Sequence, residues 1–235
     1  MCGGANGHHG PPLLVVSPHL DDAVLSCGAL LAGRPGAIVC TVFAAAPSAA
    51  MHTEWDGKSG FSDSSVAIRA RIHEDTQALA VLNAVPFHLA FRDAQYHESP
   101  SCEVLVNALS RTAAEVGASS LLMPLGLFHS DHVHVSDACL GLLERNQGLD
   151  NYIYEDLPYR SMEGVVQQRL HAFVQRGLIA TPADPRAEPT GAQHTWQAKC
   201  EALRAYASQL RALDSTGAEH AFIVERFWRL TTKPR

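Results

Sequence analysis

The chain has 235 residues, of which 46% are hydrophobic and 18% are charged, and its formal net charge is −6. These values are ordinary for a soluble globular protein with one large buried core. The negative balance and the scattered Lys and Arg residues exclude a basic surface for nucleic acid or an anionic membrane, and no apolar run approaches the ~18 residues that span a bilayer.

The N-terminal residues and the cysteines bear on domain organisation and location. Residues 1–12 lack the charged start and the apolar core of a secretory signal, so we predict a flexible leader followed by a single domain over residues 13–235. Six cysteines occur, none of them in a C-x-x-C pair and most in apolar surroundings. Reduced, buried cysteines of this kind are typical of the cytoplasm rather than of a disulfide scaffold.

From residue 13 onward, short apolar runs alternate with segments of helical periodicity. The apolar runs predict strands at 13–17, 36–45, 85–91, 119–125 and 151–157. The periodic segments predict helices at 22–32, 65–83, 102–116, 135–143, 165–176 and 195–213. Small, polar and turn residues predict a loop at 47–65, which is a candidate substrate lid, and a Pro-rich loop at 181–193.

This alternation of strands and helices predicts the fold class. Right-handed crossovers give an α/β fold, here a Rossmann-like, three-layer α/β/α arrangement with a mostly parallel sheet. In such folds, ligands bind outside the carboxyl ends of the strands. Polar clusters follow or end four of the predicted strands, namely HLDD, FRDAQY, HSDH and EDLPY. We therefore expect the four clusters to meet on one rim of the sheet.

The cluster after the first strand contains His19, Asp21 and Asp22. One interpretation is a helix N-terminus, where an Asp caps free N–H groups and favours the positive end of the helix dipole. That interpretation needs only one of the two carboxylates and leaves His19 unexplained. The other interpretation is a metal site that takes ligands from this cluster and from a second one.

The second cluster, GLFHSDHVHVSD, contains His129, Asp131, His132 and His134. A polar loop before a capped helix would explain it, although three His in six residues favour a metal site. A catalytic zinc takes three nitrogen or oxygen ligands and leaves one position for water. His19, one of the adjacent aspartates and one His of this cluster would supply that set, and the other aspartate would accept a proton from the water.

Two motifs resemble those of a known family. SPHLDDAVLSCGALLA resembles the P-H-P-D-D-E motif of the PIG-L/LmbE-like zinc-dependent deacetylases, and HSDHVHVSDA resembles that family's H-x-D-H motif. Three connecting segments are also similar, namely RARIHEDTQALAVLNA, FRDAQY and YEDLPY. The resemblance covers residues 13–230, with both metal-bearing motifs in the expected order.

The resemblance implies an LmbE-like fold and an N-acetylglucosaminyl deacetylase activity. By their places in the motifs, His19, Asp22 and His132 are implied as the zinc ligands. Asp21 is implied as the general base, and a protonated His129 as the group that stabilises the oxyanion or protonates the leaving amine. Two His and one carboxylate would also accept Fe(II).

Substrate contacts carry over more loosely. Asp93 and Arg71 lie near family positions that contact sugar hydroxyls or other substrate groups. Tyr154, Glu155 and Tyr159 could line the pocket, although an aromatic residue on a strand is more often part of the core.

The chain also departs from the family pattern. Leu20 and Ala23 replace the usual Pro and Glu of the first motif, and Leu127 and Phe128 stand where some members carry a Tyr before the second motif. None of these changes removes a ligand, so they bear on substrate choice more than on chemistry.

Other function classes fit the sequence less well. No G-x-G-x-x-G follows the first strand, as a dinucleotide site would need, and no G-x-S-x-G nucleophile elbow occurs. A non-catalytic member of the fold would be expected to lose a ligand or the base, and this chain keeps all four. The sequence therefore predicts a zinc hydrolase that removes an N-acetyl group from an amino sugar or its conjugate. The alternative substrate is another N-acyl amide, such as a thiol conjugate or a natural-product intermediate, and the oligomeric state stays open.

Overall fold

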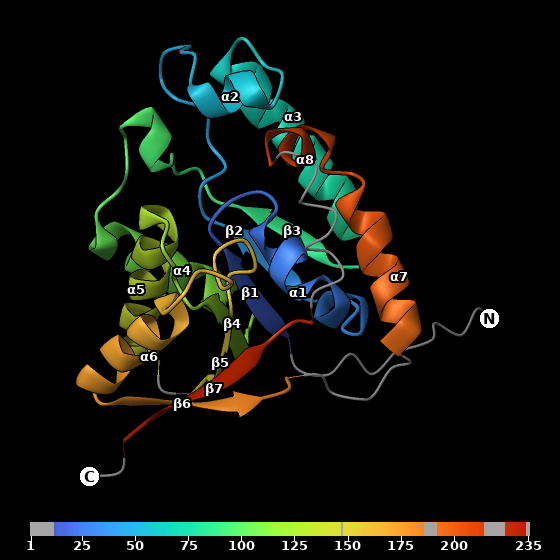
Figure 1. Cartoon of the computed structure of the whole chain (residues 1–235). Helices are drawn as coiled ribbons and strands as arrows, with labels where there is room; N and C mark the ends of the chain where they lie inside the picture. Colours follow the sequence, from blue (N-terminus) through green and yellow to red (C-terminus); the bar gives the residue numbers. More distant parts are fainter. Residues whose placement is uncertain (1–11, 147, 186–191, 214–223, 234–235) are drawn as a thin grey trace, which may run out of the picture.

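A seven-stranded sheet with the strand order β3-β2-β1-β4-β5-β7-β6 runs through the described part of the chain (Figure 1). The structure is a computed structural model and describes residues 12–146, 148–185, 192–213 and 224–233. The predicted leader lies outside these ranges except for Pro12. The strands are β1 (Leu13–Ser17), β2 (Ile38–Thr41), β3 (Val85–His88), β4 (Ser120–Pro124), β5 (Asp150–Tyr154), β6 (Leu178–Ala183) and β7 (Phe227–Thr232).

The first five strands are parallel, and β7 runs antiparallel to its neighbours β5 and β6. β1 lies in the interior of the sheet and is buried on both faces. Its residues Leu14 and Val16 enter one core, whereas Leu13 and Val15 enter the other. A strand buried on both faces needs an unbroken apolar run, and the LLVV segment of β1 is such a run.

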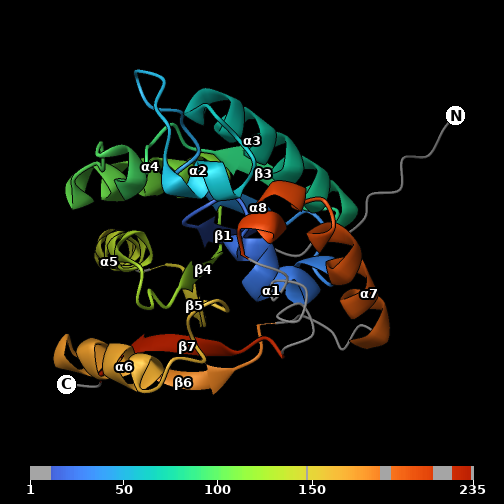
Figure 2. The same ribbon diagram turned by 45° about the horizontal axis from the view of Figure 1, so that its top comes forward.

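Helices cover both faces of the sheet (Figure 2). α4 (Cys102–Glu115), α5 (Ser130–Arg145) and α6 (Val165–Gln175) pack on the face of one core. On the other face lie α1 (Asp22–Ala32), α3 (Ser64–Val81), α7 (Ala192–Leu203) and α8 (Ala207–Ala212). The predicted three-layer α/β/α fold with a mostly parallel sheet is therefore confirmed. None of the helices that the structure describes has the length and hydrophobicity of a membrane span.

The C-terminal part of the sheet differs from the prediction. β6 and β7 were not predicted, and β6 takes up the start of the expected Pro-rich loop at 181–193, of which residues 186–191 lie outside the described residues. β6 tolerates Pro182 because it is an edge strand, where a missing N–H donor leaves no ladder bond unmade. The helix expected at 195–213 is two helices, α7 and α8, separated at residues 204–206.

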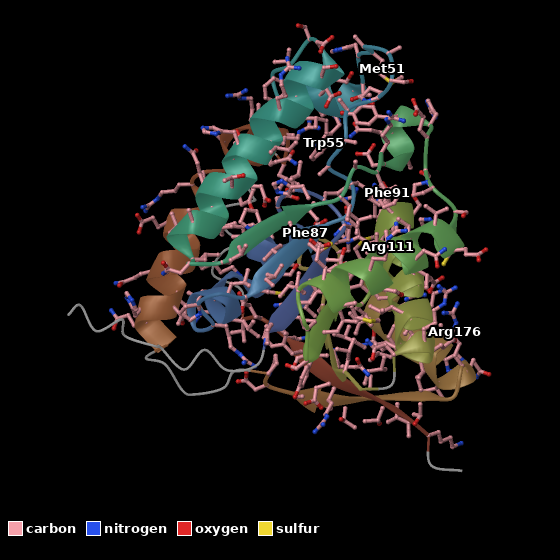
Figure 3. All side chains as sticks on the ribbon, turned by 180° about the vertical axis from the view of Figure 1, so that it is seen from behind. Met51, Trp55, Phe87, Phe91, Arg111 and Arg176 are labelled. Atoms are coloured by element: carbon pink, nitrogen blue, oxygen red, sulfur yellow. The ribbon has the colours of Figure 1, made fainter. Side chains whose placement is uncertain are left out.

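Two corrections concern segments near the expected site. α5 begins at Ser130, five residues before the predicted start, so His132 lies in its first turn rather than in a loop. The segment 47–65 contains a short helix, α2 (Glu54–Lys58), so it is not a loop throughout. Met51 and Trp55 of this segment lie at the α2 end of the molecule (Figure 3).

α1 is tied to the segment that leads into β7. The Glu225 carboxylate accepts the backbone N–H groups of Ala29 and Leu30 at 2.8 and 3.0 Å, and it pairs with Lys199 at 2.8 Å. Lys199 is fully buried, and its aliphatic stem crosses α1 at Gly28, where a Cβ would lie 2.6 Å from the Lys199 Cγ. Gly28 is therefore needed for the close approach of α7 to α1, which lie side by side (Figure 2).

Candidate active site

The carboxyl ends of β1 and β4 open onto a cavity of about 500 Å³. Its walls come from distant parts of the chain, including the turn after β1, α2, α3, the start of α5, the turn after β5, and α8. All seven site residues predicted from the sequence line this cavity, namely His19, Asp21, Asp22, Arg71, Asp93, His129 and His132. The expected meeting of polar clusters on one rim of the sheet is thus observed.

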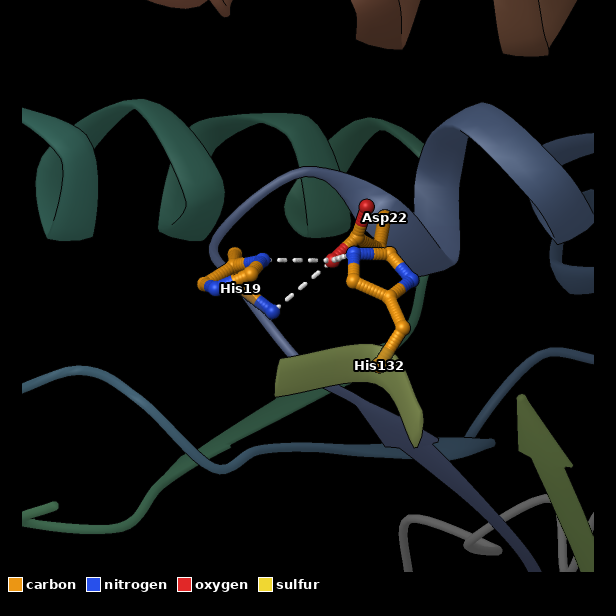
Figure 4. Close-up of side chains that lie close together, drawn as sticks. All are labelled: His19, Asp22 and His132. Carbon is orange, nitrogen blue, oxygen red and sulfur yellow. Dashed lines mark hydrogen bonds and ion pairs between the residues drawn. The ribbon is translucent and has the colours of Figure 1, made fainter. Parts of the chain in front are cut away.

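The three expected ligands bring their donor atoms to one point (Figure 4). The Asp22 Oδ2 lies 3.1 Å from the His19 Nδ1 and 3.2 Å from the His132 Nε2. One donor atom from each of the three residues lies within 4.8 Å of the others. Two imidazole nitrogens and one carboxylate oxygen form a donor set typical of a catalytic zinc site, so these residues fit a divalent ion.

Short-range hydrogen bonds shape the turn that carries this set. Ser17 is the last residue of β1. Its hydroxyl donates to the His19 carbonyl at 2.7 Å and accepts the N–H of Ala23 at 3.0 Å. The Asp22 Oδ2 accepts the His19 N–H at 2.9 Å. A Ser at the strand end and an Asp three residues after the His therefore hold His19 and Asp22 together.

Asp21 is the N-cap residue of α1, yet its side chain makes no capping hydrogen bond to the helix. Its backbone carbonyl accepts the Leu25 N–H at 2.9 Å, while its carboxylate lines the cavity. The helix-capping interpretation therefore does not account for Asp21.

The two neighbouring aspartates differ in electrostatics. Burial, together with the adjacent Asp22, raises the pKa of Asp21 to about 7. Although burial opposes ionisation of Asp22 as well, His132 and His19 hold its pKa well below the usual range. Asp22 therefore stays ionised, as a metal ligand must, and Asp21 can exchange a proton near neutral pH.

Each of the two candidate ligand histidines also contacts a carboxylate on the side away from Asp22. The His132 Nδ1 lies 2.6 Å from the Asp156 Oδ1, and the His19 Nε2 lies 3.2 Å from the Asp131 Oδ2. Burial opposes protonation of His132, but Asp22 and Asp156 outweigh it and raise the pKa of His132 to about 9. Both histidines are therefore held between two carboxylates.

His129 is the N-cap of α5 and lies at the edge of the cavity. Its Nδ1 accepts the N–H of Asp131 at 3.3 Å, and its ring lies 5.4 Å from that of His19 and stacks on Tyr159 at 6.1 Å. Burial and the neighbouring His19 lower the pKa of His129. This direction favours a neutral ring, and the protonated His129 that the resemblance implies stays a prediction. With Nδ1 acting as an acceptor, the neutral ring carries its proton on Nε2.

Asp93 and Arg71 both lie in the cavity wall, but they differ in how far their polar atoms are already paired. The Asp93 Oδ2 accepts from the Gln95 amide at 2.7 Å, whereas its Oδ1 is buried and has no partner among the described residues. Arg71 is buried and already paired with Asp56 at 2.8 Å and with Ser59 at 3.0 Å. Asp93 is therefore the freer of the two to bind a substrate group.

Several residues of this site were not predicted from the sequence. The sequence pattern indicates no role for Asp156 of the YEDLPY segment. Trp55, Gln209 and Leu213 line the cavity from α2 and the α8 segment. Nothing in the local pattern marks α8, because it reaches the cavity through tertiary packing.

Of the three residues considered at the end of the fifth strand, only one lines the cavity. Tyr159 does so. Tyr154 is a core residue whose hydroxyl donates to the Val16 carbonyl at 3.0 Å, and Glu155 is buried against Trp228.

The chain is similar to known deacetylases of this fold. It is 26% identical to the A40926 pseudoaglycone deacetylase Dbv21 over 97% of this chain and 99% of that one, with a TM-score of 0.71. It is 25% identical to the deacetylase triple mutant Orf2*T of the teicoplanin biosynthetic pathway, over 94% and 98% of the two chains, with a TM-score of 0.75.

A more distant structure shares the fold alone. The N,N'-diacetylchitobiose deacetylase from Pyrococcus horikoshii is 16% identical over 94% of this chain and 84% of that one, with a TM-score of 0.51. Among curated proteins, no matching sequence is found. The model of the family described as PIG-L: GlcNAc-PI de-N-acetylase matches residues 14–143, which include both motifs of the cavity. The chain therefore belongs to the PIG-L family of deacetylases.

Proposed function

We propose that this protein is a zinc-dependent hydrolase that removes an N-acetyl group from an amino sugar or an amino-sugar conjugate. One observation carries the proposal. The donor set of His19, Asp22 and His132 lies in the same cavity as Asp21, a buried carboxyl with a pKa of about 7 and no capping bond. A metal site beside a base that titrates near neutral pH is what amide hydrolysis by water needs.

The contacts of the residues support the following roles. When bound, zinc lowers the pKa of a water molecule toward ~7 and polarises the amide carbonyl. Asp21 accepts the proton of the attacking water and returns it to the leaving amine. His129 donates a hydrogen bond from its Nε2–H to the oxygen on which negative charge develops, because its Nδ1 accepts the Asp131 N–H. The products are acetate and a free amine.

The substrate class is proposed from the relatives and the cavity. The matching family is described by its action on GlcNAc-PI, Dbv21 is named for its action on the A40926 pseudoaglycone, and Orf2*T is a deacetylase of teicoplanin biosynthesis. A volume of about 500 Å³ falls within the usual range of small-molecule sites. The Asp93 Oδ1, which has no partner among the described residues, supports a role for Asp93 in accepting a sugar hydroxyl. We also propose a cytoplasmic location, because Cys27, Cys40 and Cys139 are buried and unpaired.

The proposal is tested with the metal and substrate together. Purified protein should hold about one divalent ion per chain, and a chelator should abolish acetate release from N-acetyl amino sugars and their conjugates. Added zinc should restore it, and added Fe(II) under anaerobic conditions identifies which ion supports faster turnover. Full activity after exhaustive chelation, with no metal detected, would overturn the proposal. Release from thiol conjugates alone would favour the alternative amide substrate.

A further inference from the structure

We propose that Asp156 is a positioning residue that selects the tautomer of His132 and thereby sets the affinity of the site for its metal. The inference rests on the proposed function, in which His19, Asp22 and His132 are the ligands. Asp156 lies outside both metal-bearing motifs and follows β5, twenty-four residues after His132 in the chain.

The first step is the contact between the two side chains. The Asp156 Oδ1 lies 2.6 Å from the His132 Nδ1, and the two residues are 0% and 1% exposed. An ionised carboxylate only accepts, so the Nδ1 must carry a proton and donate it. The lone pair of the neutral ring is then on Nε2, which is the nitrogen that faces Asp22 at 3.2 Å (Figure 4). Imidazole ligands are commonly fixed in this way by a carboxylate on the other nitrogen.

The second step is the orientation of the carboxylate itself. The Asp156 Oδ2 accepts the backbone N–H groups of Gly126 at 2.8 Å and of Leu127 at 3.1 Å. Gly126 has a φ of +84°, and a Cβ there would lie 2.6 Å from the Ser136 Cβ. This close-packed turn between β4 and α5 therefore holds one oxygen on the backbone and leaves the other for His132.

His19 provides a contrast within the same site. It faces Asp22 through Nδ1, and its Nε2 lies 3.2 Å from the Asp131 Oδ2, which also accepts the Ala94 N–H. The His19 side chain is 22% exposed, so water can replace part of that contact. The His132 ring has no such exposure. Among the described carboxylates, only that of Asp156 is within hydrogen-bonding distance of its Nδ1.

These contacts make Asp156→Asn an informative substitution. The amide keeps the size of the carboxylate, and the N–H groups of Gly126 and Leu127 require its oxygen to face them. Its NH₂ group must then face His132 and donate to Nδ1. The neutral ring would carry its proton on Nε2, where it blocks the metal. The substitution therefore preserves the packing and reverses the tautomer.

The control is a second His–carboxylate pair, in which the carboxylate is buried, the His is half-buried and neither residue lines the cavity. The Asp75 Oδ2 lies 2.7 Å from the His88 Nε2, and its Oδ1 accepts the Tyr206 hydroxyl at 2.7 Å. Asp75 is 2% exposed, so Asp75→Asn removes the charge of a buried carboxylate that contacts a His ring at a similar distance, without touching the metal ligands.

The experiment measures zinc affinity of the full chain by competition with a chelator. Asp156→Asn should weaken zinc binding ~10–100-fold, whereas Asp75→Asn should leave it at the wild-type value. Equal affinity of Asp156→Asn and wild type, or an equal loss in both variants, would overturn the inference. Failure of the wild type to bind zinc would instead overturn the proposed function.

A measurement on the wild type keeps the inference testable if Asp156→Asn does not fold. In the zinc-loaded protein, nitrogen NMR should find His132 with a proton on Nδ1 and the metal on Nε2. The signal is assigned by its absence in His132→Gln. Ligation through Nδ1, or no proton on that nitrogen, would contradict the proposed role of Asp156.

Discussion

Asp21 and Asp22 are neighbours in the chain, and their environments shift their pKa values in opposite directions. Asp22 contacts two imidazoles, which keep it ionised. The Asp21 carboxylate makes no hydrogen bond to the His19 or His132 ring. Burial and the neighbouring Asp22 raise its pKa. The charge that suits Asp22 to its proposed role as a ligand therefore also raises the pKa of Asp21, the proposed base.

Substitution of each aspartate should separate the two roles. Asp22→Ala removes a donor atom, so zinc binding should weaken and excess zinc should restore part of the activity. Asp21→Asn should keep the zinc and the fold but lose ~10²–10⁴ in turnover, the usual worth of a positioned base. Metal content and turnover, measured side by side, check the assignment. Wild-type turnover of a zinc-loaded Asp21→Asn protein would contradict it.

Burial of Asp21 should also lower the free energy of unfolding. The pKa of Asp21 is about 7 in the folded, metal-free protein and near 3.8 when unfolded, so ionisation opposes folding as pH rises between these values. Metal-free Asp21→Asn should therefore be more stable than metal-free wild type at pH 8, on the order of 1 kcal/mol or more.

Urea unfolding in the presence of a chelator measures this difference. It should shrink as the pH falls below 7, because wild-type Asp21 then becomes protonated in the folded state. A difference that is absent at pH 8, or that grows toward low pH, would show that Asp21 is not destabilised by its burial.

Among single residues, those within the two motifs could be predicted from the sequence. Two short stretches contain His19, Asp22 and His132, and their residue types are typical of a metal site. Asp156 could not be assigned a role from the sequence, because its proposed role depends on backbone N–H groups from another loop. Arg71 was expected near substrate, and its pairing with Asp56 could not be seen without the fold.

Among the elements, the segment 47–65 combines a short helix with irregular chain. α2 is held by the fully buried Asp56, which pairs with Arg71 and accepts from the Tyr96 hydroxyl. Trp55 lines the cavity and donates to the Gln209 side chain at 3.2 Å. The segment is therefore anchored at α2, and its role as a lid stays a prediction.

Limited proteolysis should test that role. Cleavage within 47–65 should slow when substrate or product is added, because a ligand in the cavity would contact Trp55 and hold the segment closed. The exposed turn at 161–164 provides an internal reference, whose cleavage rate should not change. Equal rates at 47–65 with and without every bound ligand would identify an ordinary surface segment.

The elements that could be predicted share a strong local signal. β1 and β4 are buried on both faces and therefore read as apolar runs, and α4 has a clear apolar stripe. β6 contains Pro182 and is largely exposed or half-buried, and the break between α7 and α8 has no Pro or Gly to mark it. Such elements depend on neighbours that local periodicity does not encode.

For the whole molecule, both cores draw on distant parts of the chain. The core under α1 combines residues of β1 with Tyr206 and Phe227, and the core under α5 combines β1 with Phe173 and Leu230. The family match ends at residue 143, yet Asp156, Tyr159 and Gln209 belong to the site or its support. The domain expected over 13–235 should therefore unfold as one unit.

Tryptophan fluorescence can test that expectation. Variants that retain only Trp55 in α2 or only Trp228 in β7, with the other tryptophans replaced by Phe, report on opposite ends of the chain. Their urea transitions should coincide with each other and with the loss of helical circular dichroism, as in two-state unfolding. A lower midpoint for the Trp228 probe would reveal a separately unfolding C-terminal part.

The contact of Glu225 with α1 has a consequence for synthesis on the ribosome. The carboxylate that accepts the Ala29 and Leu30 N–H groups follows them by 196 and 195 residues. At ~5–20 residues per second, translation of that interval takes about 10–40 s. The helix that follows His19 and Asp22 is thus synthesised about 10–40 s before the carboxylate that ties it to the segment leading into β7 is part of the nascent chain.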